Sequence, residues 1–128
     1  MHKLTAFLCL AFILSAQSVF DGVYTEAQAT RGSKLYPDEC DRCHGEELEG
    51  DEAPGLANEE FLADWKGRSL GDLYERIRYA MPGDHPGKLT PEQTADVLAF
   101  ILRANRFPAG NTELPADIGR LRKIRLTR

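Results

Sequence analysis

Cys40 and Cys43 are separated by two residues and followed directly by His44. This Cys-x-x-Cys-His run is the attachment signature of c-type haem. Two thiols at this spacing near a helix end can form thioethers with the two vinyl groups on one edge of a porphyrin. The imidazole of the next residue is then held beneath the iron as its proximal ligand. The sequence therefore predicts one covalent haem c per chain, bound through Cys40 and Cys43 and ligated by His44.

Two other kinds of site use cysteines at this spacing. In an oxidising compartment Cys40 and Cys43 could close a disulfide or form a redox-active pair, as in thioredoxin-like proteins. No βαβ pattern surrounds them, however, and His44 would then have no role. Together with His44 and His85 they could also hold a structural zinc, although an adjacent Cys and His make a poor tetrahedral chelate. Haem is the favoured interpretation, and both alternatives stay open at this point.

Met81 is the candidate ligand for the other side of the iron. It lies in a Met-Pro-Gly sequence between two predicted helices. A lone methionine is more often a packing residue, but a thioether is a frequent sixth ligand of haem. His85 is the rival ligand, in an Asp-His-Pro-Gly context typical of an exposed turn, and an open site is the third alternative.

Iron held by His44 and Met81 leaves no position for a substrate, and the thioether sulfur raises the reduction potential. The chain shows no nucleophile–base pair and no Gly-rich phosphate loop. The predicted function is therefore a carrier of one electron and not an enzyme, although the chain could serve as the electron-transfer subunit of a dehydrogenase. The alternative is a haem enzyme or gas-sensing cytochrome with an open distal site.

Residues 1–18 have the features of a signal peptide. A short basic start is followed by an apolar run, Leu4 to Ala16, which has the length of a signal h-region and is too short to span a bilayer. A small-x-small sequence ends at Ser18, where we expect cleavage. The expected product is a periplasmic domain over 19–128, with no stable membrane insertion after cleavage.

Capping patterns predict where the helices begin. Thr25 to Gln28 forms a capping box, so a helix should start near Glu26 and lead toward Cys40. Pro37 lacks an N–H, so a break or kink is expected near Tyr36. Residues 45–58 are rich in Gly, Pro and acidic residues and are expected to form a loop.

Three further helices are expected, and no strand pattern is present. They are a short piece at Phe61 to Trp65, a helix capped by Ser69 that stops before Pro82, and a helix capped by Thr90 that ends near Asn105. The predicted fold class is all-α. A few short helices bury little surface by themselves. A haem enclosed by the loops should therefore complete the core.

This layout resembles class I (mono-haem) cytochrome c over nearly all of residues 19–128. The shared marks are a helix that runs into the Cys40–His44 motif, a Pro-containing loop, a Met-Pro pair and an apolar last helix. The resemblance implies a cytochrome c-like fold, with short helices wrapped around the haem. It also implies that Met81 is the sixth ligand, that the Pro54 carbonyl accepts the His44 N–H, and that Trp65 reaches a haem propionate.

The resemblance further implies a crossing contact between the first and last helices. Gly32 and Tyr36 would meet Val97 and Phe100, because a residue without a side chain lets two helices approach closely. Residues 22–28 and 105–115 resemble a narrower group. Its members are attached to, or are partners of, quinohaemoprotein (PQQ-dependent) dehydrogenases. The implied partners are periplasmic redox proteins, with a PQQ-dependent dehydrogenase as the donor.

Charge is distributed unevenly along a chain whose net charge is −4. Residues 38–52 carry eight acidic residues and one arginine, whereas 120–128, within a C-terminal extension (113–128), carry five basic residues and no acidic one. Such runs usually serve solvation, but either could steer a redox partner. No basic stripe is interleaved with aromatic residues, which excludes nucleic-acid binding.

Overall fold

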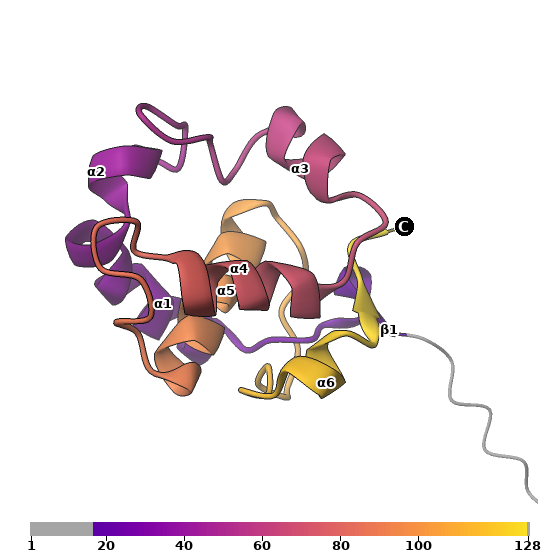
Figure 1. Ribbon diagram of the computed structural model, residues 1–128. Coiled ribbons are helices and arrows are strands. Elements are labelled where there is room, and N and C mark those ends of the chain that lie inside the picture. Colours follow the sequence, from indigo (N-terminus) through magenta and orange to yellow (C-terminus); the bar gives the residue numbers. More distant parts are fainter. Residues whose placement is uncertain (1–16, 128) are drawn as a thin grey trace, which may run out of the picture.

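The computed structural model describes residues 17–127 of the chain (Figure 1). Short helices dominate, as the all-α prediction requires. The elements, in chain order, are β1 (Gln17–Ser18), η1 (Val19–Asp21), α1 (Glu26–Glu39), α2 (Asp41–His44), α3 (Glu59–Trp65), α4 (Leu70–Ala80), α5 (Pro91–Ala104), α6 (Ile118–Leu121) and β2 (Ile124–Arg125).

The helix starts predicted from capping residues are confirmed. Ser69 and Thr90 each accept a hydrogen bond from the third helical N–H, and the side-chain oxygens of Asp72 and Gln93 accept one in turn from the N–H of the cap residue. These reciprocal bonds satisfy donors that have no partner within the helix. Residues 45–58 form a loop, as expected, and Asn58 caps α3.

The first helix differs from its prediction in two respects. Thr25 accepts from the N–H of Gln28, but the Gln28 side chain does not complete a capping box. It instead bonds the backbone of Leu114 in both directions, at 2.8 and 3.1 Å, deep in the interior. Of the break or kink predicted near Tyr36, the break is wrong, because α1 continues through Pro37 to Glu39. A proline in the last turn removes only one helical hydrogen bond.

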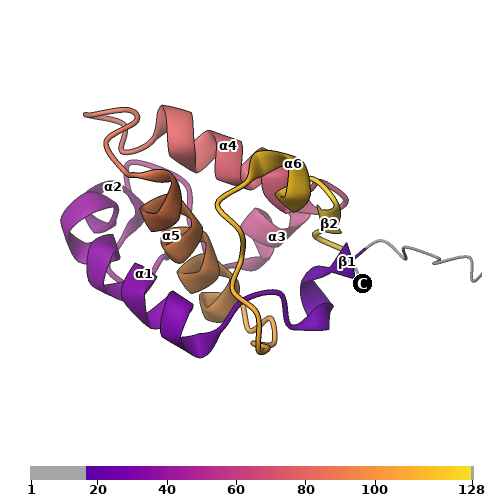
Figure 2. The same cartoon turned by 90° about the horizontal axis from the view of Figure 1, so that it is seen from below.

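Helices α1 and α5 cross closely, as Figure 2 shows from below. A Cβ built on Gly32 would lie 2.0 Å from the carbonyl oxygen of Asp96, so only glycine fits at this point. The rings of Tyr36 and Phe100 meet beside it, with their centroids 5.3 Å apart. Val97, Leu98, Ile101 and Leu102 of α5 are buried in the core.

The residues after α5 return across α1 and α4. The hydroxyl of Tyr24 donates to Phe107 O at 2.6 Å, and Gly110 N donates to Tyr24 O at 2.7 Å. The two segments of the narrower resemblance, 22–28 and 105–115, therefore pack against each other. α6 lies beside α4 (Figure 2), where the Cβ of an alanine at Gly71 would lie 2.7 Å from the backbone nitrogen of Arg122.

The two ends of the described chain meet in a short parallel sheet. Gln17 pairs with Ile124 and Ser18 with Arg125, although no strand pattern is present in the sequence. Most of the expected signal segment, residues 1–16, lies outside the described residues. Its last two residues, Gln17 and Ser18, form β1. Within residues 17–127, no helix is both long and apolar enough to cross a membrane.

Candidate cofactor-binding cavity

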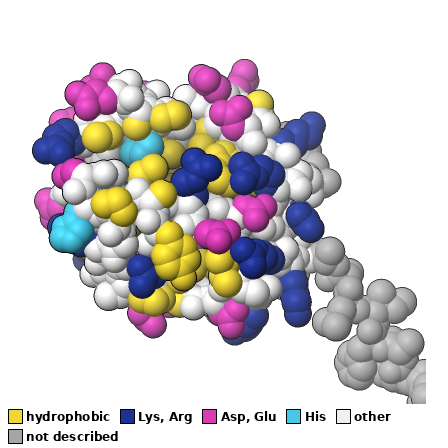
Figure 3. Space-filling view, in the orientation of Figure 1, with side chains coloured by type: hydrophobic (Ala, Val, Ile, Leu, Met, Phe, Trp, Pro, Cys, Tyr) yellow, Lys and Arg dark blue, Asp and Glu magenta, His cyan; other side chains and the backbone are white. Residues whose placement is uncertain are grey.

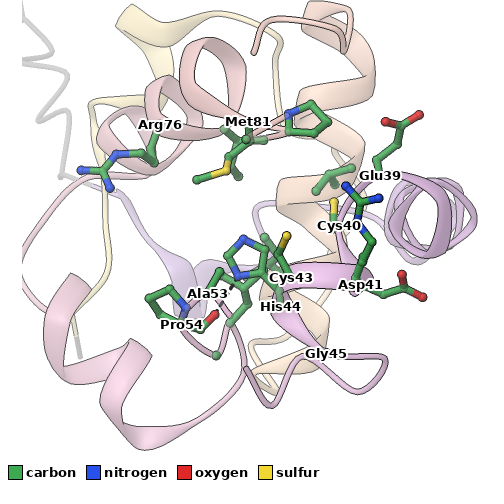
Figure 4. Close-up of a pocket in the computed structure, with 18 of the residues that line it drawn as sticks. Glu39, Cys40, Asp41, Cys43, His44, Gly45, Ala53, Pro54, Arg76 and Met81 are labelled. Atoms are coloured by element: carbon green, nitrogen blue, oxygen red, sulfur yellow. Dashed lines mark hydrogen bonds between the residues drawn. The ribbon is translucent and has the colours of Figure 1, made fainter. Parts of the chain in front are cut away.

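A cavity of about 1160 Å³ lies between α3 on one side and α4 on the other, and is closed at one end by α2 (Figure 4). Its lining includes every residue that the sequence singled out as a cofactor or iron ligand, the rival His85 among them: Cys40, Cys43, His44, Pro54, Trp65, Met81 and His85. Apolar side chains of α4 and α5, among them Leu73, Ile77, Val97 and Ile101, form its floor.

The two cysteines lie at one end of the cavity, on the turn that joins α1 to α2. Cys40 ends α1 and begins α2, and its carbonyl oxygen accepts from His44 N at 3.1 Å. Both thiols are free. Burial, with Glu39 and Asp41 nearby, raises the pKa of the Cys40 thiol to about 12. A redox-active dithiol needs a thiolate near neutral pH, so this environment does not favour the dithiol alternative.

His44 is oriented by the loop that follows it. Its Nδ1–H donates to the carbonyl oxygen of Pro54 at 2.7 Å, which leaves Nε2 free to face the cavity (Figure 4). The loop is tied back to the same turn, because Gly50 N donates to His44 O at 2.7 Å and Ala53 N to Cys43 O at 2.9 Å. An N–H···O bond of this kind fixes both the tautomer and the ring orientation of a metal-ligating histidine.

Met81 faces His44 from the opposite side of the cavity (Figure 4). It ends α4, where its N–H donates to Ile77 O, and its own carbonyl accepts from Gly87 N at 3.2 Å, closing the 81–87 loop. Pro82 beside it is buried, whereas His85 is exposed at the rim. The loop therefore directs Met81 inward.

The end of the cavity opposite the cysteines presents two arginines and an aromatic ring, and the acidic Glu60 and Asp64 of α3 also line the cavity. The guanidinium of Arg68 lies 4.2 Å from the ring centroid of Trp65, and that of Arg76 lies 5.9 Å from it. All three residues line the cavity, and Arg76 lies across it from the two cysteines in Figure 4. Sequence reasoning missed both arginines. Nothing separates them from the other Lys and Arg residues of the chain until α4 and the 66–69 loop are placed beside Trp65.

Two ion pairs connect the cysteine end to the 81–88 loop. Lys88 Nζ lies 2.7 Å from Glu39 Oε1, and Arg42 Nη2 lies 3.0 Å from Asp84 Oδ2. Figure 3 shows the face of the molecule seen in Figure 1. Asp and Glu side chains lie along its upper and left edges, whereas Lys and Arg are more frequent in its right half.

The donors suit a porphyrin iron better than a zinc ion. His44 and Met81 face each other with room between them, and the thiols lie to one side (Figure 4). Among the residues that the structure describes, no three His, Cys, Asp or Glu side chains gather as a metal site. The zinc alternative would require His85 to join the cysteines and His44. His85 lines the same cavity, on the loop tied to the cysteine end by the Arg42–Asp84 pair, but it does not gather with them as a metal-binding group.

Comparison with known proteins identifies the type of domain. The family described as cytochrome c oxidase, cbb3-type, subunit III matches residues 27–101, more than half of the chain. No curated protein sequence matches. Among solved structures, the chain is similar to a chain of the sulfane dehydrogenase SoxCD from Paracoccus pantotrophus, with a TM-score of 0.50 and 22% identity. The match covers 69% of this chain and 53% of that one, so this chain spans about half the length of its neighbour. At that identity the likeness shows a shared fold.

Proposed function

This chain belongs to the cytochrome c family, whose domains bind covalent haem c and transfer electrons through it; from this premise we propose that it is a periplasmic carrier of one electron on a His/Met-ligated haem. The observation that carries the proposal is the placement of His44 and Met81 on opposite sides of one cavity, with both cysteine thiols at its end (Figure 4). Such a haem supplies a reversible ferric–ferrous couple without an open iron position.

The protein residues have distinct roles in this proposal. Cys40 and Cys43 would anchor the cofactor, and His44 and Met81 would be the ligands of its iron. Pro54, through its carbonyl oxygen, holds the His44 ring in one tautomer and one orientation. Because the ligands are fixed by packed elements, the coordination geometry need not change with the oxidation state.

We assign the end of the cavity that carries Arg68 and Arg76 to the haem propionates. Thioethers at Cys40 and Cys43 fix the vinyl edge of a porphyrin, and the propionates lie on the opposite edge. That edge would face Trp65, Arg68 and Arg76. The indole N–H can donate to a carboxylate, and a guanidinium pairs with one through charge-assisted hydrogen bonds.

Export and partner choice belong to the same proposal. Residues 1–18 would direct the chain to the periplasm, and an intact-mass measurement on exported protein should give an N-terminus near Val19. The proposal that the donor is a PQQ-dependent dehydrogenase rests only on the resemblance of residues 22–28 and 105–115 to the narrower group. A redox enzyme as partner has independent support, because the structural neighbour is itself part of a dehydrogenase.

One purification tests the proposal. Protein isolated from a periplasm should give a pyridine haemochrome spectrum with one haem c per chain, a reversible single-electron titration, and the weak long-wavelength ferric band of sulfur ligation. A ferric spectrum without that band, together with ready binding of carbon monoxide to the ferrous form, would instead establish the open-site alternative.

A further inference from the structure

The C-terminal segment is hydrogen-bonded to the loop that carries Arg68. Leu126 N donates to Arg68 O at 2.9 Å, and Gly67 N donates to Leu126 O at 3.1 Å. Ser69 forms an isolated antiparallel bridge with Arg125. The backbone on both sides of Arg68 is therefore paired with residues 125 and 126, so the position of this loop depends on the C-terminal segment.

The segment is in turn anchored by its own apolar side chains. Leu121, Ile124 and Leu126 are buried, whereas the basic residues between them point outward. Arg122 is drawn back onto α4 by Glu75, whose carboxylate lies 3.1 Å from its guanidinium. None of these residues lines the cavity. The alternation of buried aliphatic and exposed basic residues shows that the C-terminal segment packs on the core through its aliphatic side chains.

The placement of the Arg68 side chain depends on this C-terminal segment. It is about half exposed, and Asp72 approaches its guanidinium only to 4.0 Å. Its close contact is the face of Trp65 at 4.2 Å. A side chain held by one stacking contact and one long ion pair keeps its place only where the backbone below it is fixed. The Leu126 hydrogen bonds contribute to that fixation, together with the local bond from Arg68 N to Trp65 O at 3.0 Å.

We propose that strand β2 and the residues directly after it position Arg68 at the end of the cavity opposite the cysteines, and that they thereby set the reduction potential of the haem. The proposal rests on the proposed function, because it needs a bound haem with its propionates at that end. A guanidinium beside the propionates favours ferrous iron, which carries one positive charge less, and it keeps the propionates ionised. Loosening the C-terminal segment should lower the reduction potential of the haem and make that potential vary with pH.

The experiment compares two buried leucines of the C-terminal extension in the haem-loaded protein. Leu126→Ala loosens the segment beside Arg68. Leu114→Ala removes an equally buried leucine that contacts Gln28 of α1, away from the cavity. Midpoint potentials are measured from pH 5 to 9 by optical redox titration, together with the sulfur charge-transfer band and the unfolding midpoint.

We expect Leu126→Ala to lower the potential and to increase its fall with rising pH, while the sulfur band is retained. Leu114→Ala should leave the potential unchanged although it also reduces stability. Arg68→Gln should reproduce the shift, and adding Leu126→Ala to Arg68→Gln should change nothing further. If Leu126→Ala yields no folded protein, Leu126→Val serves in its place, with a smaller shift of the same sign.

Three results would overturn the inference: an unchanged potential in the Leu126 variant that folds, equal shifts from Leu126 and Leu114, or full additivity of the Leu126 and Arg68 substitutions. These outcomes are distinct from failure of the proposed function. That failure would be visible in the wild-type protein itself, as a lack of covalent haem or of a reversible titration.

Discussion

Lys88 lies with its ammonium nitrogen 2.7 Å from a carboxylate oxygen of Glu39, and so ties the loop after Met81 to the last turn of α1. Glu39 directly precedes Cys40, so this pair joins the two segments that would hold the haem from its two faces. Only 14% of the Glu39 side chain is exposed. The pair is therefore less screened than Arg42–Asp84, whose side chains are 79% and 65% exposed.

Breaking this pair should loosen Met81. In Glu39→Gln the 81–88 loop loses its tie to α1, so an added ligand such as imidazole should displace Met81 from ferric iron at lower concentration. The measurement is the loss of the sulfur charge-transfer band during an imidazole titration. Asp84→Asn breaks the exposed Arg42 pair and serves as the matched control, because exposed pairs contribute little. Equal effects of the two variants would contradict a special role for Glu39.

The same pair predicts a pH dependence. The hydrogen bond that Lys88 donates to Glu39, aided by nearby carboxylates, raises the pKa of Lys88 above its ordinary value. A raised lysine pKa means that the contribution of the pair is complete below about pH 10.4, the ordinary lysine value. It is lost as pH rises through the higher folded value. Imidazole titrations of wild type and Glu39→Gln should therefore differ at pH 7 and converge at strongly alkaline pH.

The attachment chemistry predicts the behaviour of the cysteine variants. Cys40→Ala or Cys43→Ala should abolish or cripple maturation, because each removes one thioether. Denaturing electrophoresis of the wild type should show peroxidase-type haem staining at the mass of the chain. Stain that migrates free of the polypeptide would contradict covalent attachment.

The two candidate sixth ligands can be separated directly. Met81→Ala should lower the potential, remove the sulfur charge-transfer band and allow carbon monoxide to bind ferrous iron, because under the proposed ligation the thioether would both occupy the site and favour the reduced state. His85→Ala should do none of these, since His85 is exposed on the rim. If His85→Ala alone opens the iron, the ligand assignment is wrong.

The crossing of α1 and α5 predicts a large loss of stability at Gly32. In Gly32→Ala the new methyl group would meet the backbone of Asp96, and backbone cannot move aside as a flexible side chain can. We expect the free energy of unfolding to fall by about 3 kcal/mol. Gly119→Ala is the control, because its Cβ would make only an ordinary 3.4 Å contact with Asp117. Guanidinium unfolding of the haem-loaded proteins measures both.

Docking to the electron donor tests the role of the charge runs. Transient redox interfaces are small and rely on long-range charge, so reduction by the true donor should slow above about 0.1 M salt, where the Debye length is about 10 Å. Neutralising Glu46, Glu47, Glu49 and Asp51 together should slow it. Neutralising Arg120, Arg122, Lys123 and Arg125 should matter less, since Arg122 is already paired and the segment lines no part of the cavity. A rate indifferent to salt and to both variant sets would mean that the charges serve solvation.

The sequence was most informative where chemistry is local. The spacing of Cys40, Cys43 and His44 fixes which groups can attach a porphyrin, and the capping residues Ser69 and Thr90 satisfy helix N–H groups only three positions away. Such contacts exist as soon as a turn forms. They can therefore be predicted without knowledge of the fold.

Where local signals competed with distant partners, the tertiary structure decided. Gln28 has the residue type and position for a capping box, yet its amide bonds Leu114, which is 86 residues away, because a buried amide must satisfy both its donor and its acceptor. The sequence of the basic tail showed only its charge, whereas the fold buries its aliphatic residues and pairs its backbone with the loop of Arg68. The sequence by itself determined which cofactor the chain can attach and the element that presents it. Only packing decided which arginines face the far end of the cavity and what holds them there, because those contacts join segments that meet only in the folded chain.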